Sequence, residues 1–232
     1  MKLAIMQPYF LPYIGYFQLI AAVDVFVLYD NIKYTKKGWI NRNRILRNGT
    51  DVVFSLPLKK DSDECHVVQR ELAGSFDRQK LLNQIKGAYE KAPFFDSVFP
   101  LFERVVNFQS VNLFDYIYYS VCELCKFVDL STKILISSTV DVDHDLKSQD
   151  KVLAICNALN ADMYINAIGG VELYQKDVFS KRGIELKFIK SLPFEYSQFG
   201  NDFVPWLSMV DVLMFNSKEA TKHYLLGGYE LV

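Results

Sequence analysis

The chain has 232 residues, of which 50% are hydrophobic and 23% charged, and 26 basic and 27 acidic side chains leave a formal net charge of -1. This composition excludes a disordered, collagen-like or low-complexity chain, and the balanced charge gives no reason to expect a nucleic-acid partner. No membrane span is expected, because Gln18 and Asp24 interrupt the best apolar stretch, Tyr16 to Tyr29, before it reaches the roughly 18 residues required. The N-terminus has too short an apolar run for a signal peptide, so we expect a cytoplasmic protein.

The N-terminal region predicts a strand, a loop, a helix and a second strand. The apolar run Lys2 to Met6 predicts the first strand, the amphipathic segment Tyr13 to Ala22 the helix, and Val23 to Leu28 the second strand. A crossover of this kind joins two parallel strands. The loop Gln7 to Pro12 then lies at the carboxyl end of the first strand, where ligands bind in open parallel sheets.

An antiparallel hairpin is predicted next. Two β-rich runs, Gly38 to Arg47 and Asp51 to Pro57, are separated by Arg47-Asn48-Gly49-Thr50, which is a strong hairpin-turn signal.

The first arm of this hairpin carries a candidate anion site. Arg42 and Arg44 share one face and Asn41 and Asn43 share the other, because side chains alternate along a strand. Two arginines on one face, beside Trp39, suit a phosphate or carboxylate through bidentate contacts. A solvated strand surface is an equally good interpretation, since exposed arginines are common.

Three consecutive helices are predicted between Asp77 and Val128, where apolar residues recur at helical spacing. Pro93 is expected to open the second helix and Asn112 to cap the third, with Asp115 in its first turn. The many aromatic residues of this region are interpreted as core rather than as a platform for bases.

Alternation of strands and helices then resumes. The expected order is strand Lys133 to Ile136, helix Ser148 to Leu159, strand Met163 to Asn166, glycine turn Ile168-Gly169-Gly170, helix Tyr174 to Lys181 and strand Glu185 to Ile189. We therefore expect an α/β fold in one domain, residues 1–232, with a mostly parallel Rossmann-like sheet, a β-hairpin insertion and a helical insertion at about 77–128.

This arrangement predicts the place of the cleft. It should lie at the carboxyl ends of the strands that begin near Lys2, Lys133 and Met163. Three segments would converge there: Gln7 to Tyr16, Ser137 to Thr139 and Asn166 to Gly170.

The densest motif is the segment Gln7 to Ile20, which begins Gln-Pro-Tyr-Phe-Leu-Pro-Tyr-Ile-Gly-Tyr. Its prolines stiffen a loop that leads into a helix start containing Gly15, where free N–H groups and the helix dipole favour an anion. Tyr9, Tyr13 and Tyr16 would flank a ring or sugar, and Gln7 would hydrogen-bond it. The alternative is a loop packed by its own aromatic side chains.

This segment strongly resembles the signature of the WbqC-like proteins, which are found with genes for bacterial O-antigen and other surface-polysaccharide biosynthesis. The resemblance extends over essentially the whole chain. The further similar blocks are Asp30; Lys37 to Ile45, with Trp39, Asn41, Arg42 and Arg44; Ser137-Ser138; Ile165 to Tyr174, with Gly169 and Gly170; and Trp206 to Asn216, with Asp211. Leu11 stands where the family motif has Phe.

The resemblance implies an enzyme that transfers or ligates a glycyl, other aminoacyl or acyl group to the amine of a nucleotide-linked amino sugar. Glycine or another acyl donor would be the second substrate. Trp39, Arg42 and Arg44 would hold the nucleotide diphosphate. The alternative is a non-catalytic sugar-nucleotide or polysaccharide-assembly partner, since no nucleophile is recognised.

Three side chains are the catalytic candidates under this interpretation. Asp30 or Asp211 would accept the ammonium proton as general base, and Tyr13 would present its hydroxyl to the cleft. Tyr174 and the other residues of the similar blocks would contact the substrate.

A weaker resemblance concerns the turn Tyr13-Ile14-Gly15-Tyr16, which looks like the H-x-G-H turn with which nucleotidylyltransferases and pantothenate synthetases hold ATP. Ser137-Ser138-Thr139 looks like their second phosphate-contacting segment. Both histidine positions are tyrosine here, so a cation would have to come from Arg42, Arg44, Lys59 or Lys147. ATP is therefore an alternative cofactor, and the sequence names no other.

Two further groups carry no predicted site. The acidic run Asp141 to Asp145 lacks the spacing of an EF-hand loop and is interpreted as a solvated turn. Cys122 and Cys125 have no second pair at zinc-site spacing, so we expect two packing thiols and no metal.

Overall fold

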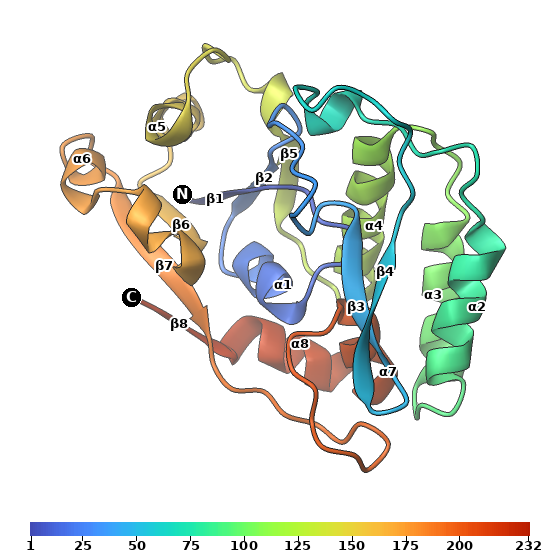
Figure 1. Cartoon of the computed structure of the whole chain (residues 1–232). Coiled ribbons are helices and arrows are strands. Elements are labelled where there is room, and N and C mark those ends of the chain that lie inside the picture. The colour runs from blue at the N-terminus through green and yellow to red at the C-terminus, as the bar shows by residue number, and fades with distance from the viewer.

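The computed structural model describes residues 1–232, which form a six-stranded sheet, a separate two-stranded hairpin and eight α-helices (Figure 1). The large sheet contains β1 (Lys2–Met6), β2 (Val25–Leu28), β5 (Lys133–Ile136), β6 (Met163–Ala167), β7 (Glu185–Ser191) and β8 (Tyr229–Leu231), and the hairpin contains β3 (Arg42–Arg47) and β4 (Thr50–Ser55). The helices are α1 (Ile14–Ala21), α2 (Arg78–Tyr89), α3 (Phe95–Val106), α4 (Leu113–Phe127), α5 (Ser148–Ala158), α6 (Lys176–Ser180), α7 (Met209–Phe215) and α8 (Lys218–Gly227). Short 3-10 helices lie at Val67–Gln69, Ser137–Thr139 and Ile168–Leu173.

The strand order of the large sheet is β5-β2-β1-β6-β7-β8, and every pairing is parallel except that of β7 with β8. This confirms the predicted α/β class with a mostly parallel, Rossmann-like sheet. The chain builds outward from β1 to β2 and β5, and then returns to the other side of β1 to build β6 and β7. The topological switch point therefore lies between β1 and β6.

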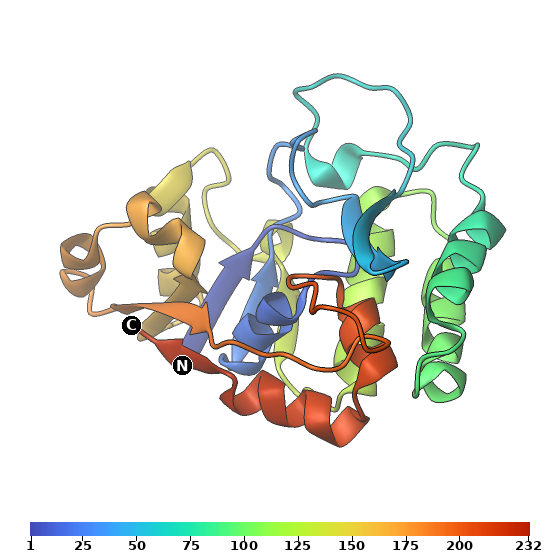
Figure 2. The same ribbon diagram turned by 60° about the horizontal axis from the view of Figure 1, so that its bottom comes forward.

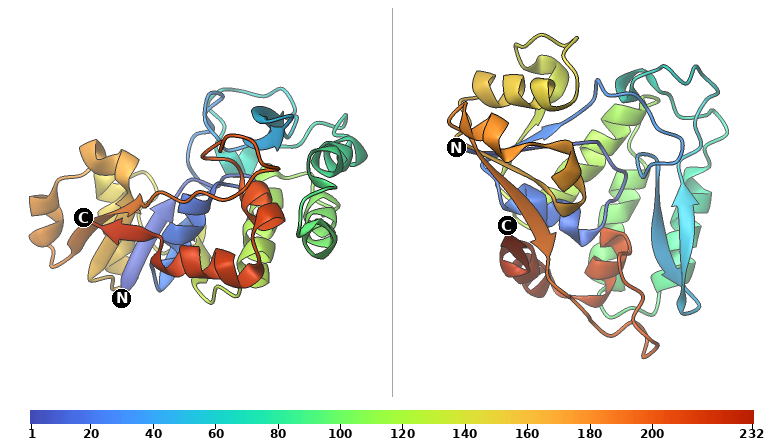
Figure 3. Two further views of the ribbon diagram at one scale, coloured as in Figure 1. Left: turned by 90° about the horizontal axis from the view of Figure 1, so that it is seen from below. Right: turned by 60° about the vertical axis from the view of Figure 1, so that its left-hand side comes forward.

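The two faces of the sheet pack against different helices. Leu3 and Ile5 belong to one core cluster together with Val152 of α5, whereas Ala4 belongs to a second, larger cluster together with Phe17 of α1. This division follows from the alternation of side chains along a strand. Helices α5 and α6 lie at one side of the molecule and α2, α3 and α4 at the other (Figures 1 and 3), and both chain ends lie on the side of the molecule away from α2 and α3 (Figure 2).

Several local predictions are confirmed. The hairpin turns at Asn48 and Gly49, whose φ angles of 51° and 76° are the positive values that a tight hairpin turn requires. The side chain of Asn112 caps α4 by accepting the backbone N–H of Asp115. The limits of β1 and β5 are those expected from their apolar runs.

Two local predictions are wrong. Helix α3 begins at Phe95 and not at Pro93, because the N–H of Phe95 bonds to the carbonyl of Ala92 in a preceding turn. Helix α1 is not amphipathic, since Ile14 to Ile20 are all buried. Its buried polar residue, Gln18, donates to the carbonyls of Tyr224 and Gly228 around the end of α8, which satisfies its amide.

No helix of the chain combines the length and apolar character that crossing a membrane requires.

Candidate functional site

A cavity of about 970 Å³ opens at the carboxyl ends of the central strands. Met6 and Gln7 bring the end of β1 to it, Asn166 and Ala167 bring the end of β6, and Tyr29 follows β2. The cavity therefore lies at the switch point of the sheet, as a ligand site in this fold should. Its volume is at the upper end of the roughly 300–1,000 Å³ typical of small-molecule sites.

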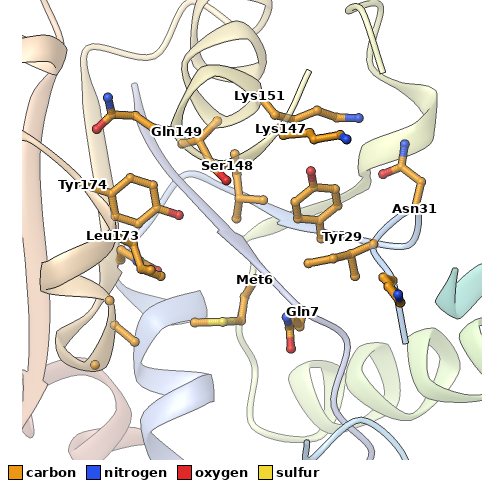
Figure 4. A pocket seen from close by; sticks show the side chains of 18 of the residues that line it. Met6, Gln7, Tyr29, Asn31, Lys147, Ser148, Gln149, Lys151, Leu173 and Tyr174 are labelled. Atoms are coloured by element: carbon orange, nitrogen blue, oxygen red, sulfur yellow. The ribbon is translucent and has the colours of Figure 1, made fainter. Parts of the chain in front are cut away.

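One wall of the cavity carries two lysines, beside the carboxylate of Asp145. Lys147 and Lys151 reach it from the first turn of α5, and their ammonium groups point toward the side chain of Asn31 above the ring of Tyr29 (Figure 4). Lys151 is only 1% exposed. Its Nζ donates to the carbonyl of His144 at 2.7 Å, which leaves two of its three N–H donors without a protein partner.

Lys151 is buried without an acidic partner in contact, and burial lowers the pKa of its ammonium group. Asp143, Asp145 and Asp30 lie near enough to oppose that lowering. Neither Lys147 nor Lys151 forms an ion pair with a carboxylate of the chain. Both cations are therefore available to an anion in the cavity.

The N-terminus of α5 adds backbone donors to this wall. Its N-cap residue, Lys147, makes no side-chain capping bond, so the first N–H groups of the helix keep no internal acceptor. Ser148 has a φ of 49°, a left-handed conformation that serine rarely adopts, and it also lines the cavity. An exposed helix N-terminus beside two lysines favours a phosphate or carboxylate.

Behind the cavity wall, Asp30 anchors a polar cluster. The Oδ1 atom of Asp30 accepts hydrogen bonds from the backbone N–H of Ser138 and from the hydroxyl of Ser137, each at 2.9 Å. The Ser137 hydroxyl also lies 2.5 Å from Asn31 Oδ1. The amide of Asn31 in turn lies 2.9 Å from His144 Nδ1. Asn31 and His144 line the cavity, whereas Asp30 and the two serines do not. The predicted segment Ser137 to Thr139 therefore supports the site from behind.

The residues of the N-terminal motif lie together at the opposite wall: Gln7, Tyr9, Tyr13, Gly15 and Tyr16 all line the cavity. The hydroxyl of Tyr16 is fully buried and donates to the Gln7 carbonyl, and that of Tyr9 contacts the Gln7 side chain at 3.4 Å. The Tyr13 hydroxyl has no protein partner. A Cβ at Gly15 would lie 2.4 Å from the Tyr13 ring, so this glycine makes room for Tyr13 rather than for a phosphate.

The glycine turn after β6 also reaches the cavity. Gly169, Gly170 and Tyr174 line it, and the Tyr174 hydroxyl points into it (Figure 4). A Cβ at Gly170 would collide with the side chain of Asn166 at 2.2 Å, whereas one at Gly169 would meet nothing. Packing against Asn166 therefore accounts for Gly170 without a ligand.

The hairpin residues lie outside the cavity. Arg42 and Arg44 flank the ring of Trp39, as their strand positions predict, with guanidinium carbons 5.8 and 5.6 Å from its centre. Asn41 is occupied within the fold, accepting from Tyr34 and donating to the Leu56 carbonyl. Of the four cations suggested from the sequence for a phosphate site, only Lys147 lines the cavity.

Asp211 lies in a buried hydrogen-bond network away from the cavity. It is fully buried, and its carboxylate accepts hydrogen bonds from Tyr89, Tyr196 and Gln198 at 2.6–2.8 Å. Burial raises the pKa of this carboxyl group, while the three hydrogen bonds oppose the rise. Asp211, expected from the sequence as a possible general base, neither lines the cavity nor touches solvent, so the structure separates it from the candidate site.

The sequence analysis missed Lys151, Tyr29 and Asn31. Tyr29 and Asn31 flank the predicted Asp30 at the carboxyl end of a parallel strand, which is a recognisable signal. Lys151 gave none, because a lysine in a helix ordinarily faces solvent. No group of three or more His, Cys, Asp or Glu side chains is placed to hold a metal ion.

Comparison with known proteins places these features in one family. The family model described as the WbqC-like protein family matches residues 7–223, a range that includes the N-terminal motif, the cavity and the polar cluster of Asp30. The chain is also similar to the uncharacterized protein Rv1507c of Mycobacterium tuberculosis, with 25% identity and with 97% of each chain covered. The family match spans far more than half of the sequence. The chain therefore belongs to the WbqC-like protein family.

Proposed function

We propose that the cavity binds a nucleotide-linked amino sugar, with its phosphates at the N-terminus of α5 between Lys147 and Lys151. The observation that carries this proposal is the position of two unpaired lysines and a free helix end at the switch point of a Rossmann-like sheet. Under this proposal the diphosphate lies at the N-terminus of α5 rather than on Arg42 and Arg44.

The rest of the cavity suits the remainder of such a ligand. Gln7 and the hydroxyl of Tyr13 offer polar groups on the wall opposite α5, and Tyr29 and Tyr174 offer rings that a base or sugar could contact. A cavity of about 970 Å³ has room for a ligand larger than a free phosphate or a single amino acid.

We further propose that the protein acylates the amine of this sugar, with glycine as the acyl group, in surface-polysaccharide biosynthesis. The support is membership of the WbqC-like family. In this reaction the sugar nitrogen attacks an activated acyl carbon, a C–N bond forms, the bond to the activating group breaks, and the ammonium proton leaves. Neither carboxylate suggested as base lines the cavity, but the Ser137 hydroxyl links Asp30 to Asn31 at the cavity wall, so we assign proton acceptance to the Asp30 cluster.

Thermal-shift measurements test the binding step. Uridine diphosphate and a uridine-diphosphate amino sugar should raise the melting temperature, since each binds only the folded state. Lys147→Met should reduce this shift. Lys222→Met is a matched control, because Lys222 is a surface lysine of α8 paired with Asp129 and outside the cavity. Equal shifts in both variants would contradict a phosphate site at α5.

Product analysis tests the reaction separately. The protein is incubated with the amino-sugar nucleotide and glycine, with and without ATP, and the mass of the sugar nucleotide is measured. An added glycyl mass supports acylation, and its dependence on ATP identifies the activating co-substrate. The incubation is repeated with glycine already activated, as a thioester or on tRNA, because free glycine without ATP carries no leaving group. Binding without product under all of these conditions would support the non-catalytic partner instead.

A further inference from the structure

A second aromatic surface adjoins the cavity and is not explained by nucleotide binding. The chain contains two tryptophans, and both are exposed, Trp39 at 42% and Trp206 at 57%. Trp206 packs edge-on against Tyr13, with ring centres 5.9 Å apart, and Tyr13 lines the cavity. We call Tyr13, Trp39, Trp206, Arg42 and Arg44 the aromatic shelf.

The aromatic shelf is held rigidly. Arg44 joins its two halves, since its guanidinium lies over the ring of Trp39 and donates to the Trp206 carbonyl at 3.2 Å. The backbone N–H of Ser208 donates to the Arg44 carbonyl, and the backbones of Ser208 and Tyr13 pair in an isolated antiparallel β-bridge. Trp206 has a φ of 60°, a conformation that a tryptophan keeps only when its surroundings impose it.

The two arginines of the aromatic shelf differ in their pairing. Arg44 forms an ion pair with Asp51 at 3.1 Å, so its charge is already compensated. Arg42 donates its Nε to the Gly38 carbonyl, forms no ion pair with any carboxylate, and lies 5.8 Å from the ring centre of Trp39. The terminal nitrogens of Arg42 therefore have no hydrogen-bond partner in the chain and lie beside the partly exposed indole of Trp39.

We propose that the aromatic shelf binds a sugar residue that carries a carboxylate, with its ring against the exposed tryptophans and its carboxylate on Arg42. The apolar face of a pyranose ring covers an indole, and a guanidinium matches a carboxylate in a bidentate geometry. A single uncompensated arginine favours one negative charge over a diphosphate, which the two lysines of α5 suit better. Because Tyr13 belongs both to the aromatic shelf and to the cavity lining, this sugar would lie next to the ligand of the cavity. Its position relative to a bound nucleotide rests on the proposed function, whereas its binding to the aromatic shelf does not.

Intrinsic fluorescence tests this proposal directly, because the two tryptophans of the aromatic shelf are the only ones in the chain. Trigalacturonate should change the tryptophan emission in a saturable manner, and maltotriose, a neutral trisaccharide of the same size, should do so much more weakly. Arg42→Gln should weaken the binding of trigalacturonate by about tenfold or more and leave that of maltotriose unchanged.

The controls separate this site from a general charge effect and from the cavity. Arg47→Gln removes an exposed arginine from the end of the same strand and should bind trigalacturonate like the parent protein. The titration is repeated with Lys147→Met, which should leave it unchanged even if nucleotides fail to bind. The proposal is overturned if trigalacturonate and maltotriose bind alike, if neither alters the emission, or if uridine diphosphate alters it and loses that effect in Arg42→Gln.

Discussion

Replacing Lys151 with methionine is the most informative single change in the cavity. Methionine keeps the length and flexibility of the buried stem and removes the charge. The variant loses the charged hydrogen bond to the His144 carbonyl, worth about 1.5–3 kcal/mol, but it no longer buries an ammonium group, which offsets much of that loss. We expect the free energy of unfolding of the ligand-free protein to change by no more than about 1–2 kcal/mol.

Ligand binding should change much more. A charge-assisted contact between Lys151 and a phosphate contributes about 1.5–3 kcal/mol, so its removal should weaken binding by about tenfold or more. At a ligand concentration of about 100 Kd the parent protein gains about 2.7 kcal/mol, which raises the Tm of a chain of this size by about 5–11 °C. A tenfold weaker variant should keep about half of this shift.

The assay is differential scanning fluorimetry of the parent protein, Lys151→Met and Lys222→Met over a range of uridine diphosphate concentrations. Lys222→Met should match the parent both with and without nucleotide. The reasoning is refuted if Lys151→Met keeps the full nucleotide shift, or if its ligand-free Tm falls so far that the lysine is shown to be a structural element instead of a ligand.

Three further outcomes are expected. Asp211→Ala leaves three donors, two of them buried, without their acceptor and should destabilise the protein by about 3 kcal/mol or more, measured by urea unfolding; an unchanged midpoint would contradict the structural role. Gln7→Ala and Tyr13→Phe should leave Tm nearly unchanged and reduce nucleotide binding, measured by calorimetry, whereas a loss of stability alone would assign both residues to packing. Cys122→Ser combined with Cys125→Ser should retain ligand binding, and stoichiometric zinc in the purified parent protein would disprove that these thiols are inert.

The central sheet was predictable because its information is local. The apolar runs of β1 and β5 end at a loop or a serine turn, so their lengths follow from the sequence. The C-terminal elements after β7 carried no such signal. Helix α7 is buried on every side, which removes the periodicity that identifies a surface helix, and β8 is a three-residue edge strand defined only by its pairing with β7.

The cavity-lining residues that could be predicted are mainly those in the segments that follow the parallel strands. Gln7, Gly169 and Tyr174 were expected at the cleft and line the cavity, since the carboxyl ends of parallel strands meet at one edge. Arg42 and Arg44 were correctly placed on one face beside Trp39, but their distance from the cavity depends on how the hairpin packs against the rest of the chain. No local pattern contains that information.

The pH dependence of binding gives a final test of Lys151, with a defined sign. Burial lowers the pKa of this lysine, and Asp143, Asp145 and Asp30 only oppose that effect. A phosphate beside the ammonium group stabilises its charged form and therefore raises its pKa in the complex. Between the two pKa values the protein takes up a proton on binding, so affinity falls as the pH rises through the lowered pKa of the free protein. Calorimetry in buffers of different ionisation enthalpy measures that uptake. Lys151→Met should abolish it, and an identical pH profile in parent and variant would show that another group binds the proton.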